Sequence, residues 1–177
     1  RLSTPESNMP AGPIMIEALR KLAVQLDQHH SGIPLETLER YVKALDLTLP
    51  EVFDLLQFDR TKYTRTQVYR SAYCEVLLFV WLPGQHSSIH DHAGSSCVVR
   101  VISGHATETR FELAAGRLLR DTTSDFAEGS VTSSFDEDIH RVSNEDQAGR
   151  PLVTLHAYSP PLSTFRVYDD LPLAASA

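Results

Sequence analysis

The chain has 177 residues, 42% of them hydrophobic, which is typical of one soluble globular domain with its own core. Its formal net charge of −7, without long runs of like charge, argues against a nucleic-acid-binding protein, which usually presents a basic face. The longest apolar run (76–82) is too short for a membrane span, and residues 1–13 lack the apolar core of an export signal. Two cysteines make no disulfide framework. We therefore expect a cytoplasmic protein with reduced thiols.

The first third of the chain is predicted to be helical. Residues 1–12 are rich in Ser, Pro and Gly and are expected to form a loose tail. From Pro13, apolar residues recur at spacings of three and four, which indicates a helix with one apolar face. A second helix is predicted over residues 34–45 and a third over 48–56, started by Thr48 or the proline that follows it.

After residue 58 the pattern changes to short segments rich in β-branched and aromatic residues, each closed by Gly, Pro, Asn or Asp. These predicted strands lie within residues 66–84, 96–104, 105–113, 116–124, 129–135, 139–144, 151–160 and 164–169. Strands at such spacing, without helices between them, predict an antiparallel barrel or a double-sheet jelly roll. We therefore predict a single, mainly β domain over 1–177, mostly helical over 1–57 and a β-barrel over 58–177.

Histidines are concentrated in one short segment, at positions 86, 90 and 92. His90 and His92 are two residues apart, so in a strand both imidazoles face the same side. A metal ion needs a third convergent ligand, and the best candidate is His140, at the start of the predicted strand 139–144. His86 is expected to be a solvent-exposed loop residue.

The spacing around these histidines is similar to the two motifs of the cupin family. Residues 84–104 follow the first motif, G-x5-H-x-H-x3,4-E-x6-G, except that Cys97 stands where glutamate is usual. Residues 129–144 follow the second, G-x5-P-x-G-x2-H-x3-N, with Phe135 and Glu137 in place of proline and glycine. The resemblance implies a cupin (jelly-roll) barrel with His140 in the position of a metal ligand.

The missing glutamate leaves two readings of the metal site. If Cys97 does not coordinate, three neutral imidazoles leave a dicationic metal with an open face, suited to an anionic, bidentate substrate. If Cys97 is a fourth ligand, the site is closed and resembles a structural zinc site.

The chain also resembles the cysteine dioxygenase family over roughly residues 55–170. The resemblance rests on YTR (63–65), HSSIHDHAGSSC (86–97), IHRVSN (139–144) and LHAYSPP (155–161), whose order and spacing agree as well as their composition. It implies that the metal is Fe(II) and that its ligands are the three histidines at 90, 92 and 140.

Five further residues receive roles from this resemblance. Arg65 matches the arginine that binds the substrate carboxylate, with Tyr63 beside it; its planar fork of donors suits a carboxylate, and Arg70 is a nearby alternative. Tyr158 matches the active-site phenol, and His156 the histidine that hydrogen-bonds it. Cys97 matches the cysteine that animal members join to this tyrosine by a thioether bond. The resemblance also implies a cis peptide bond at Ser159–Pro160.

The implied function is an iron(II)-dependent dioxygenase of cysteine catabolism, which adds both atoms of O2 to the sulfur of L-cysteine to give cysteine sulfinate. No organic cofactor is expected. Three alternatives stay open: a dioxygenase for 3-mercaptopropionate or a related thiol, another metal-dependent cupin enzyme such as an isomerase, and a non-enzymatic cupin that binds a small ligand. Relatives that prefer 3-mercaptopropionate carry glutamine at the arginine position, so Arg65 favours cysteine.

Overall fold

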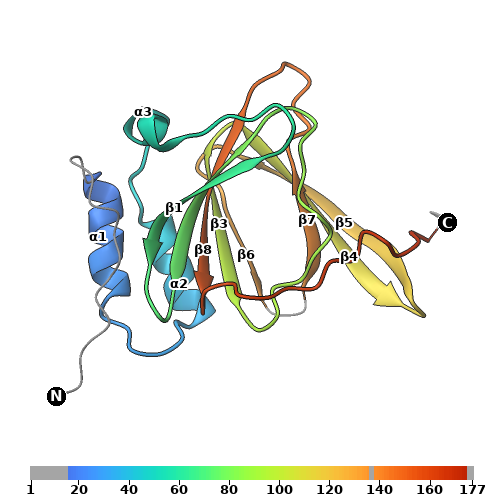
Figure 1. Ribbon diagram of the computed structural model, residues 1–177, viewed down its shortest axis with the longest axis horizontal. Coiled ribbons are helices and arrows are strands. Elements are labelled where there is room, and N and C mark those ends of the chain that lie inside the picture. Colours follow the sequence, from blue (N-terminus) through green and yellow to red (C-terminus); the bar gives the residue numbers. More distant parts are fainter. Residues whose placement is uncertain (1–15, 136–137, 175–177) are drawn as a thin grey trace.

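The computed structural model describes residues 16–135 and 138–174 (Figure 1). The predicted tail 1–12, the beginning of the predicted first helix and Glu137 of the second motif lie outside these residues. Within them, a helical N-terminal part precedes the strands, as the change of pattern after residue 58 predicts. None of the described helices is long and apolar enough to cross a membrane.

The N-terminal part contains α1 (Glu17–Leu26), α2 (Leu35–Lys43) and α3 (Leu49–Val52), which continues into a 3-10 turn, η1 (Phe53–Leu55). The third helix begins as predicted, with a capping box in which the Thr48 backbone N–H donates to Glu51 over 2.8 Å. It is shorter than predicted, because only Val52 of α3 is buried and little packing supports a longer helix.

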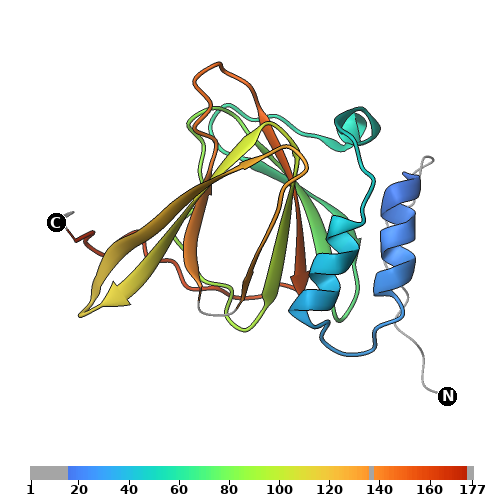
Figure 2. The ribbon, with the colours of Figure 1, turned by 180° about the vertical axis from the view of Figure 1, so that it is seen from behind.

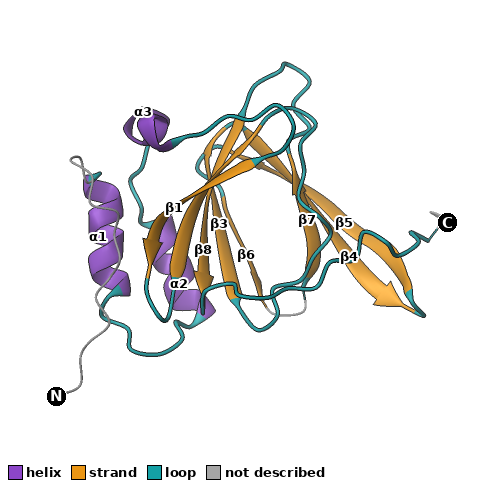
Figure 3. Ribbon diagram, in the orientation of Figure 1, coloured by secondary structure: helices purple, strands orange, loops and turns teal. Residues whose placement is uncertain are grey.

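Two antiparallel sheets form the barrel (Figure 3). Their strands are β1 (Thr64–Arg70), β2 (Glu75–Trp81), β3 (Ser96–Ser103), β4 (His105–Ala114), β5 (Arg117–Ala127), β6 (Val131–Phe135), β7 (Ile139–Ser143) and β8 (Leu152–Ser159). One sheet has the order β1-β2-β8-β3-β6 and the other β5-β4-β7, and the β4–β5 hairpin projects beyond the barrel. The mainly β barrel with an N-terminal helical segment is thus confirmed.

Strand β8 connects the helical layer with the interior of the barrel. Every residue of β8 is buried, because both of its faces are covered. Val153, Leu155 and Ala157 belong to the core that packs against the helices, whereas the alternate residues face the interior. The strand ends at Ser159, whose peptide bond to Pro160 is cis, as predicted.

The helices cover the outer face of the five-stranded sheet, as Figures 1 and 2 show from opposite sides. Helix α2 contacts β3, β6 and β8. Leu22 and Leu26 of α1 and Leu38 and Val42 of α2 share one apolar core with residues of the sheet, including Leu155. Helices and sheet therefore bury a common set of side chains.

The prediction of a strand at 164–169 is wrong. These residues belong to an extended segment, residues 160–171, which we call the C-terminal strap. The strap pairs with a loop instead of a strand: the Tyr168 backbone N–H donates to the Ile89 carbonyl and the Asp91 N–H to the Arg166 carbonyl. Because a loop offers no continuous ladder, regular pairing is limited to a single bridge between Val167 and His90.

Candidate metal centre

His90 and His92 do not lie in a strand, contrary to the prediction. They belong to the loop 82–95 between β2 and β3, and only His140 comes from a strand, β7. The loop is held against β7 by a pair of backbone hydrogen bonds, His90 N–H to His140 C=O (3.0 Å) and His140 N–H to His90 C=O (2.9 Å). This pairing brings together two candidate ligands that are fifty residues apart in the sequence.

The three imidazoles converge as the motif spacing predicts. One ring nitrogen from each of His90, His92 and His140 lies within 4.8 Å of the others. The Nδ1–H of His90 donates to the Ser88 carbonyl over 2.8 Å, and the Nδ1–H of His140 donates to Oε1 of Glu108 over 2.7 Å. These bonds leave the Nε2 lone pair of both rings free to bind a metal.

His92 provides the test of whether these residues fit a metal ion. Its side chain is completely buried, and neither of its ring nitrogens has a hydrogen-bond partner among the described residues. An unpaired buried polar group costs about 1–3 kcal/mol, so such a ring needs another partner. Burial lowers the pKa of His92 to about 2 and, together with the nearby His140, that of His90 to about 4. Both rings are therefore neutral at pH 7, as metal ligands must be.

Glu108 is a residue of the site that the sequence did not reveal. It lies on β4, is only 4% exposed, and holds His140 through one carboxylate oxygen. Burial alone raises its pKa, but the hydrogen bond from His140 and the positive charge of Arg110 outweigh burial, so its pKa is lowered. The available signal was weak: Glu108 follows the small apolar Ala106 by two residues and so shares its face, but Phe111 reaches the inward face only through the register shift between Thr109 and Phe111.

Cys97 lies opposite Tyr158. The two residues are directly paired on β3 and β8, and both are buried in one small cluster. The chain reaches this register through a turn in which Ala93 and Gly94 have positive φ angles of 45° and 89°. Burial raises the pKa of the Cys97 thiol to about 12, which disfavours the thiolate that a metal ligand requires.

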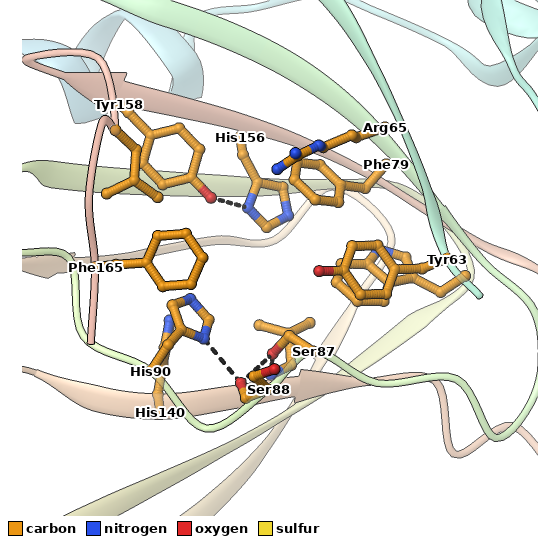
Figure 4. Close-up of a pocket in the computed structure, with 13 residues that line it drawn as sticks. Tyr63, Arg65, Phe79, Ser87, Ser88, His90, His140, His156, Tyr158 and Phe165 are labelled. Carbon is orange, nitrogen blue, oxygen red and sulfur yellow. Dashed lines mark hydrogen bonds between the residues drawn. The ribbon is translucent and has the colours of Figure 1, made fainter. Parts of the chain in front are cut away.

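A cavity of about 80 Å³ adjoins the histidines (Figure 4). Its lining includes His90, His140, His156 and Tyr158, and Arg65 and Tyr63 lie on the far side from His90. Tyr63 stacks on Trp81 with 4.4 Å between ring centres, which forms an aromatic wall. Arg65 is the one permanently charged side chain among the described lining residues.

The alternative arginine is engaged elsewhere. Arg70 forms an ion pair with the buried Glu75 at 2.5 Å and does not line the cavity. Glu75 in turn accepts the backbone N–H of Leu162 at the start of the strap.

Tyr158 stands at the end of a hydrogen-bonded chain inside the barrel. The Trp81 Nε1–H can only donate, and it donates to the Thr154 hydroxyl over 3.0 Å. Thr154 still has its own hydrogen to donate, and we assign it to His156 Nε2 (2.9 Å), so that His156 Nδ1–H donates to the Tyr158 hydroxyl (3.1 Å). This assignment leaves the Tyr158 hydroxyl hydrogen free to point into the cavity.

Burial fixes the protonation of this chain. It lowers the pKa of His156 to about 3 and raises that of Tyr158 well above its usual value, with Cys97 contributing to the second shift. At pH 7, Tyr158 is thus a neutral phenol held by a neutral imidazole.

Sequence reasoning missed the apolar walls of the cavity. Phe79 and Trp81 of β2, and Leu162 and Phe165 of the strap, line it together with the predicted residues. The Phe165 ring lies 5.6 Å from that of His90, between centres. Aromatic residues in a strand are ordinary core residues in a sequence, so nothing marked these as part of a site.

His86 and His105 are exposed, as expected for residues outside the site, and Cys74 is buried away from it.

A jelly-roll barrel that encloses three convergent histidines defines a cupin with a candidate metal centre. The chain belongs to the cysteine dioxygenase type I family, whose model matches residues 21–171. It is 28% identical over 148 residues to cysteine dioxygenase type 1 of Bos taurus, covering 77% of this chain and 70% of that protein. It is 27% identical over 163 residues to the Danio rerio enzyme of the same name, covering 89% and 80%.

Solved structures agree on the fold. A Klebsiella pneumoniae protein with a double-stranded β-helix domain matches with a TM-score of 0.52 at 18% identity, covering 66% of this chain and 92% of that one. Oxalate decarboxylase of Lactobacillus farciminis matches with a TM-score of 0.51 at 20% identity, covering 66% and 34%.

Proposed function

We propose that the protein is an iron(II)-dependent thiol dioxygenase that oxidises L-cysteine with O2 to cysteine sulfinate. One observation carries the proposal: histidines of the candidate metal centre and Arg65 line the same cavity, which measures about 80 Å³. A cavity of this size suits a small molecule that bridges a metal and a guanidinium. Three imidazole ligands with open coordination positions suit iron(II).

Arg65 is the group that we expect to bind the substrate carboxylate. Its guanidinium can donate two parallel hydrogen bonds to a carboxylate, and no described residue lining the cavity is acidic. Tyr63, Phe79 and Trp81 stack on one another and form the neighbouring wall.

When bound, iron would supply a coordination site for the substrate thiolate and the activation of O2. The chain's own contribution is to orient the reactants and to hold a proton near them. We assign the proton donor to Tyr158, whose hydroxyl receives a hydrogen bond from His156 and keeps its own hydrogen for the cavity. His156 is then a positioning residue, fixed from behind by Thr154.

We further propose a cytoplasmic protein that folds as one domain, since the helices and the sheet share one core. Its two buried cysteines are free. We also propose that Cys97 and Tyr158, which are paired on β3 and β8, form the thioether bond that the family resemblance implies.

The test is O2 consumption by the iron-loaded protein with cysteine, 3-mercaptopropionate and cysteamine in parallel, in the wild type and in Arg65→Ala. Loss of a charge-assisted pair costs about 1.5–3 kcal/mol, so kcat/KM for cysteine should fall at least tenfold while iron content stays near normal. Cysteamine, which has no carboxylate, should lose little.

Arg60→Ala serves as the matched control, because Arg60 is an exposed arginine close to Arg65 in the sequence but outside the cavity. An equal loss for cysteine and cysteamine would contradict the role of Arg65. Faster turnover of 3-mercaptopropionate than of cysteine by the wild type would change the proposed substrate. No O2 uptake with any thiol would refute the proposed activity.

A further inference from the structure

The position of Cys97 raises a question of charge at the metal centre. In the first cupin motif a glutamate stands there, and as a ligand it would add one negative charge to the metal. Here the residue is a buried thiol that faces Tyr158, and its raised pKa keeps it neutral. The group that could hold a metal therefore consists of three histidines and no acidic residue, as far as the described residues show.

A carboxylate nevertheless lies close to this group. Glu108 is 4% exposed, and its Oε1 accepts the Nδ1–H of His140 over 2.7 Å. Burying a carboxylate is costly unless the charge is paired and hydrogen-bonded, so its location needs such partners. The other oxygen, Oε2, lies 3.3 Å from Nε of Arg110. One carboxylate oxygen thus accepts a hydrogen bond from His140, and the other contacts the Arg110 guanidinium, which is nearer the surface.

Arg110 fixes the carboxylate in place. Its Nη2 donates to the Ser133 carbonyl of β6 over 3.1 Å, and its Nη1 lies 3.9 Å from Asp138, just before β7. The Asp138 carboxylate accepts the backbone N–H of Phe135. Arg110 of β4 therefore links Glu108 to β6 and to the residue before β7, and the carboxylate cannot turn away without losing its contacts with Arg110 and His140.

We propose that Glu108 supplies the metal centre with negative charge from behind His140, in place of the glutamate ligand that Cys97 has replaced. A carboxylate bound to the Nδ1–H of a histidine makes its Nε2 a stronger metal ligand and fixes the orientation of the ring. Because the charge acts through the ring, it occupies no coordination position. Glu108 is thus a positioning residue, and Arg110 holds its carboxylate in place. The inference rests on the proposed metal centre, but not on thiol oxidation.

The test is the affinity of the purified, metal-free protein for Co²⁺ and, without oxygen, for Fe²⁺, measured by competition with a chelator. Glu108→Gln keeps the shape of the side chain and an acceptor for His140, but removes the charge. We expect its affinity to be about 10- to 100-fold weaker and the visible absorption of bound Co²⁺ to shift. Glu112→Gln, an exposed glutamate on the same strand, should match the wild type in both measurements.

A merely structural role would lower the thermal midpoint of the metal-free protein and leave the affinity of the folded fraction and the Co²⁺ spectrum unchanged. That result overturns the proposal. Glu108→Asp keeps the charge but withdraws it from His140, so its affinity should lie between those of the wild type and Glu108→Gln. If Glu108→Gln yields no folded protein, a wild-type affinity in Glu108→Asp would overturn the proposal instead. The measurement needs neither thiol nor O2. The role of Glu108 can therefore be confirmed or refuted even if the protein proves to have no thiol dioxygenase activity.

Discussion

Cys97 and Tyr158 show how one backbone turn decides the chemistry of a side chain. A regular strand running on from His92 would point Cys97, five residues later, away from the ligand side. The positive φ angles of Ala93 and Gly94 reverse the chain before β3 begins, and the thiol then lies beside the phenol. Both groups are neutral and buried, so the pair is well packed before any bond forms.

We predict that aerobic turnover with iron joins Cys97 to Tyr158 by a thioether bond. O2 is the oxidant; the thiol and the ring each lose one hydrogen, and the intact mass falls by two hydrogens. Peptide mapping should find the bond in the wild type but not in Cys97→Ser. The control is Cys74→Ser, which should still form the bond because Cys74 belongs to a different core cluster from Cys97. Unmodified Cys97 and Tyr158 peptides from protein that has turned over would refute the bond.

At the level of residues, the sequence revealed those parts of the site that depend on short spacing. His90 and His92 are two residues apart, as are His156 and Tyr158, and these distances could be interpreted without a fold. Glu108 could not be found in this way, because its role depends on the pairing of β4 with β7, which places it next to His140. Residue type alone does not distinguish it from the exposed Glu112.

The C-terminal strap is the element whose role differs most from its predicted structure. Its alternating sequence resembles a strand, but its hydrogen bonds go to the loop that carries His90 and His92. Asp91, between these two histidines, accepts the Arg166 backbone N–H (3.0 Å) and the Tyr168 hydroxyl (2.8 Å). The strap is held at its other end by Glu75, so Phe165 lies between two anchors and forms a fixed wall of the cavity.

We predict that Phe165 limits the length of the thiol that the enzyme accepts. In Phe165→Ala, the ratio of kcat/KM for homocysteine to that for cysteine should rise about tenfold, since one methylene in an apolar pocket is worth roughly 1–3 kcal/mol. Phe135→Ala is the matched control, because Phe135 is 52% exposed, against 44% for Phe165, and lies outside the cavity. An unchanged ratio in Phe165→Ala would show that another residue sets the limit.

The elements themselves were largely predictable. Apolar periodicity identified α1 and α2, and turn residues marked the ends of most strands, because both signals are local. The predicted segment 66–84 is two strands, β1 and β2, because the turn at 71–74 contains no Gly, Pro, Asn or Asp. The strap and the histidine loop were assigned to strands since their sequences suit extended backbone. Whether an extended segment joins a sheet depends on its neighbours, which no local pattern contains.

For the molecule as a whole, the buried histidines make stability depend on pH. His156 has a pKa of about 3 in the folded protein, lowered by burial, against about 6.5 in an unfolded chain. Between these values the unfolded state binds the extra proton, so the free energy of unfolding falls as the pH falls below 6.5. His90 and His92 act in the same direction when no metal is bound.

We predict that the metal-free protein loses about 2 kcal/mol of unfolding free energy through His156 alone between pH 7 and pH 5. Urea unfolding at both pH values should show a correspondingly smaller loss in His156→Gln than in the wild type. His105→Gln, which alters an exposed histidine, should behave as the wild type. Equal losses in wild type and His156→Gln would mean that His156 is protonated in the folded protein.

Strand β8 has a further consequence for anyone who wishes to re-engineer this protein. Its odd-numbered residues hold the helices and its even-numbered residues Thr154, His156 and Tyr158 form the proton-bearing chain, so no position in the strand is spare. Directed evolution toward new substrates should begin with the strap and β1, whose Phe165 and Arg65 line the cavity and are exposed. Libraries that randomise β8 would mostly yield unfolded or inactive chains.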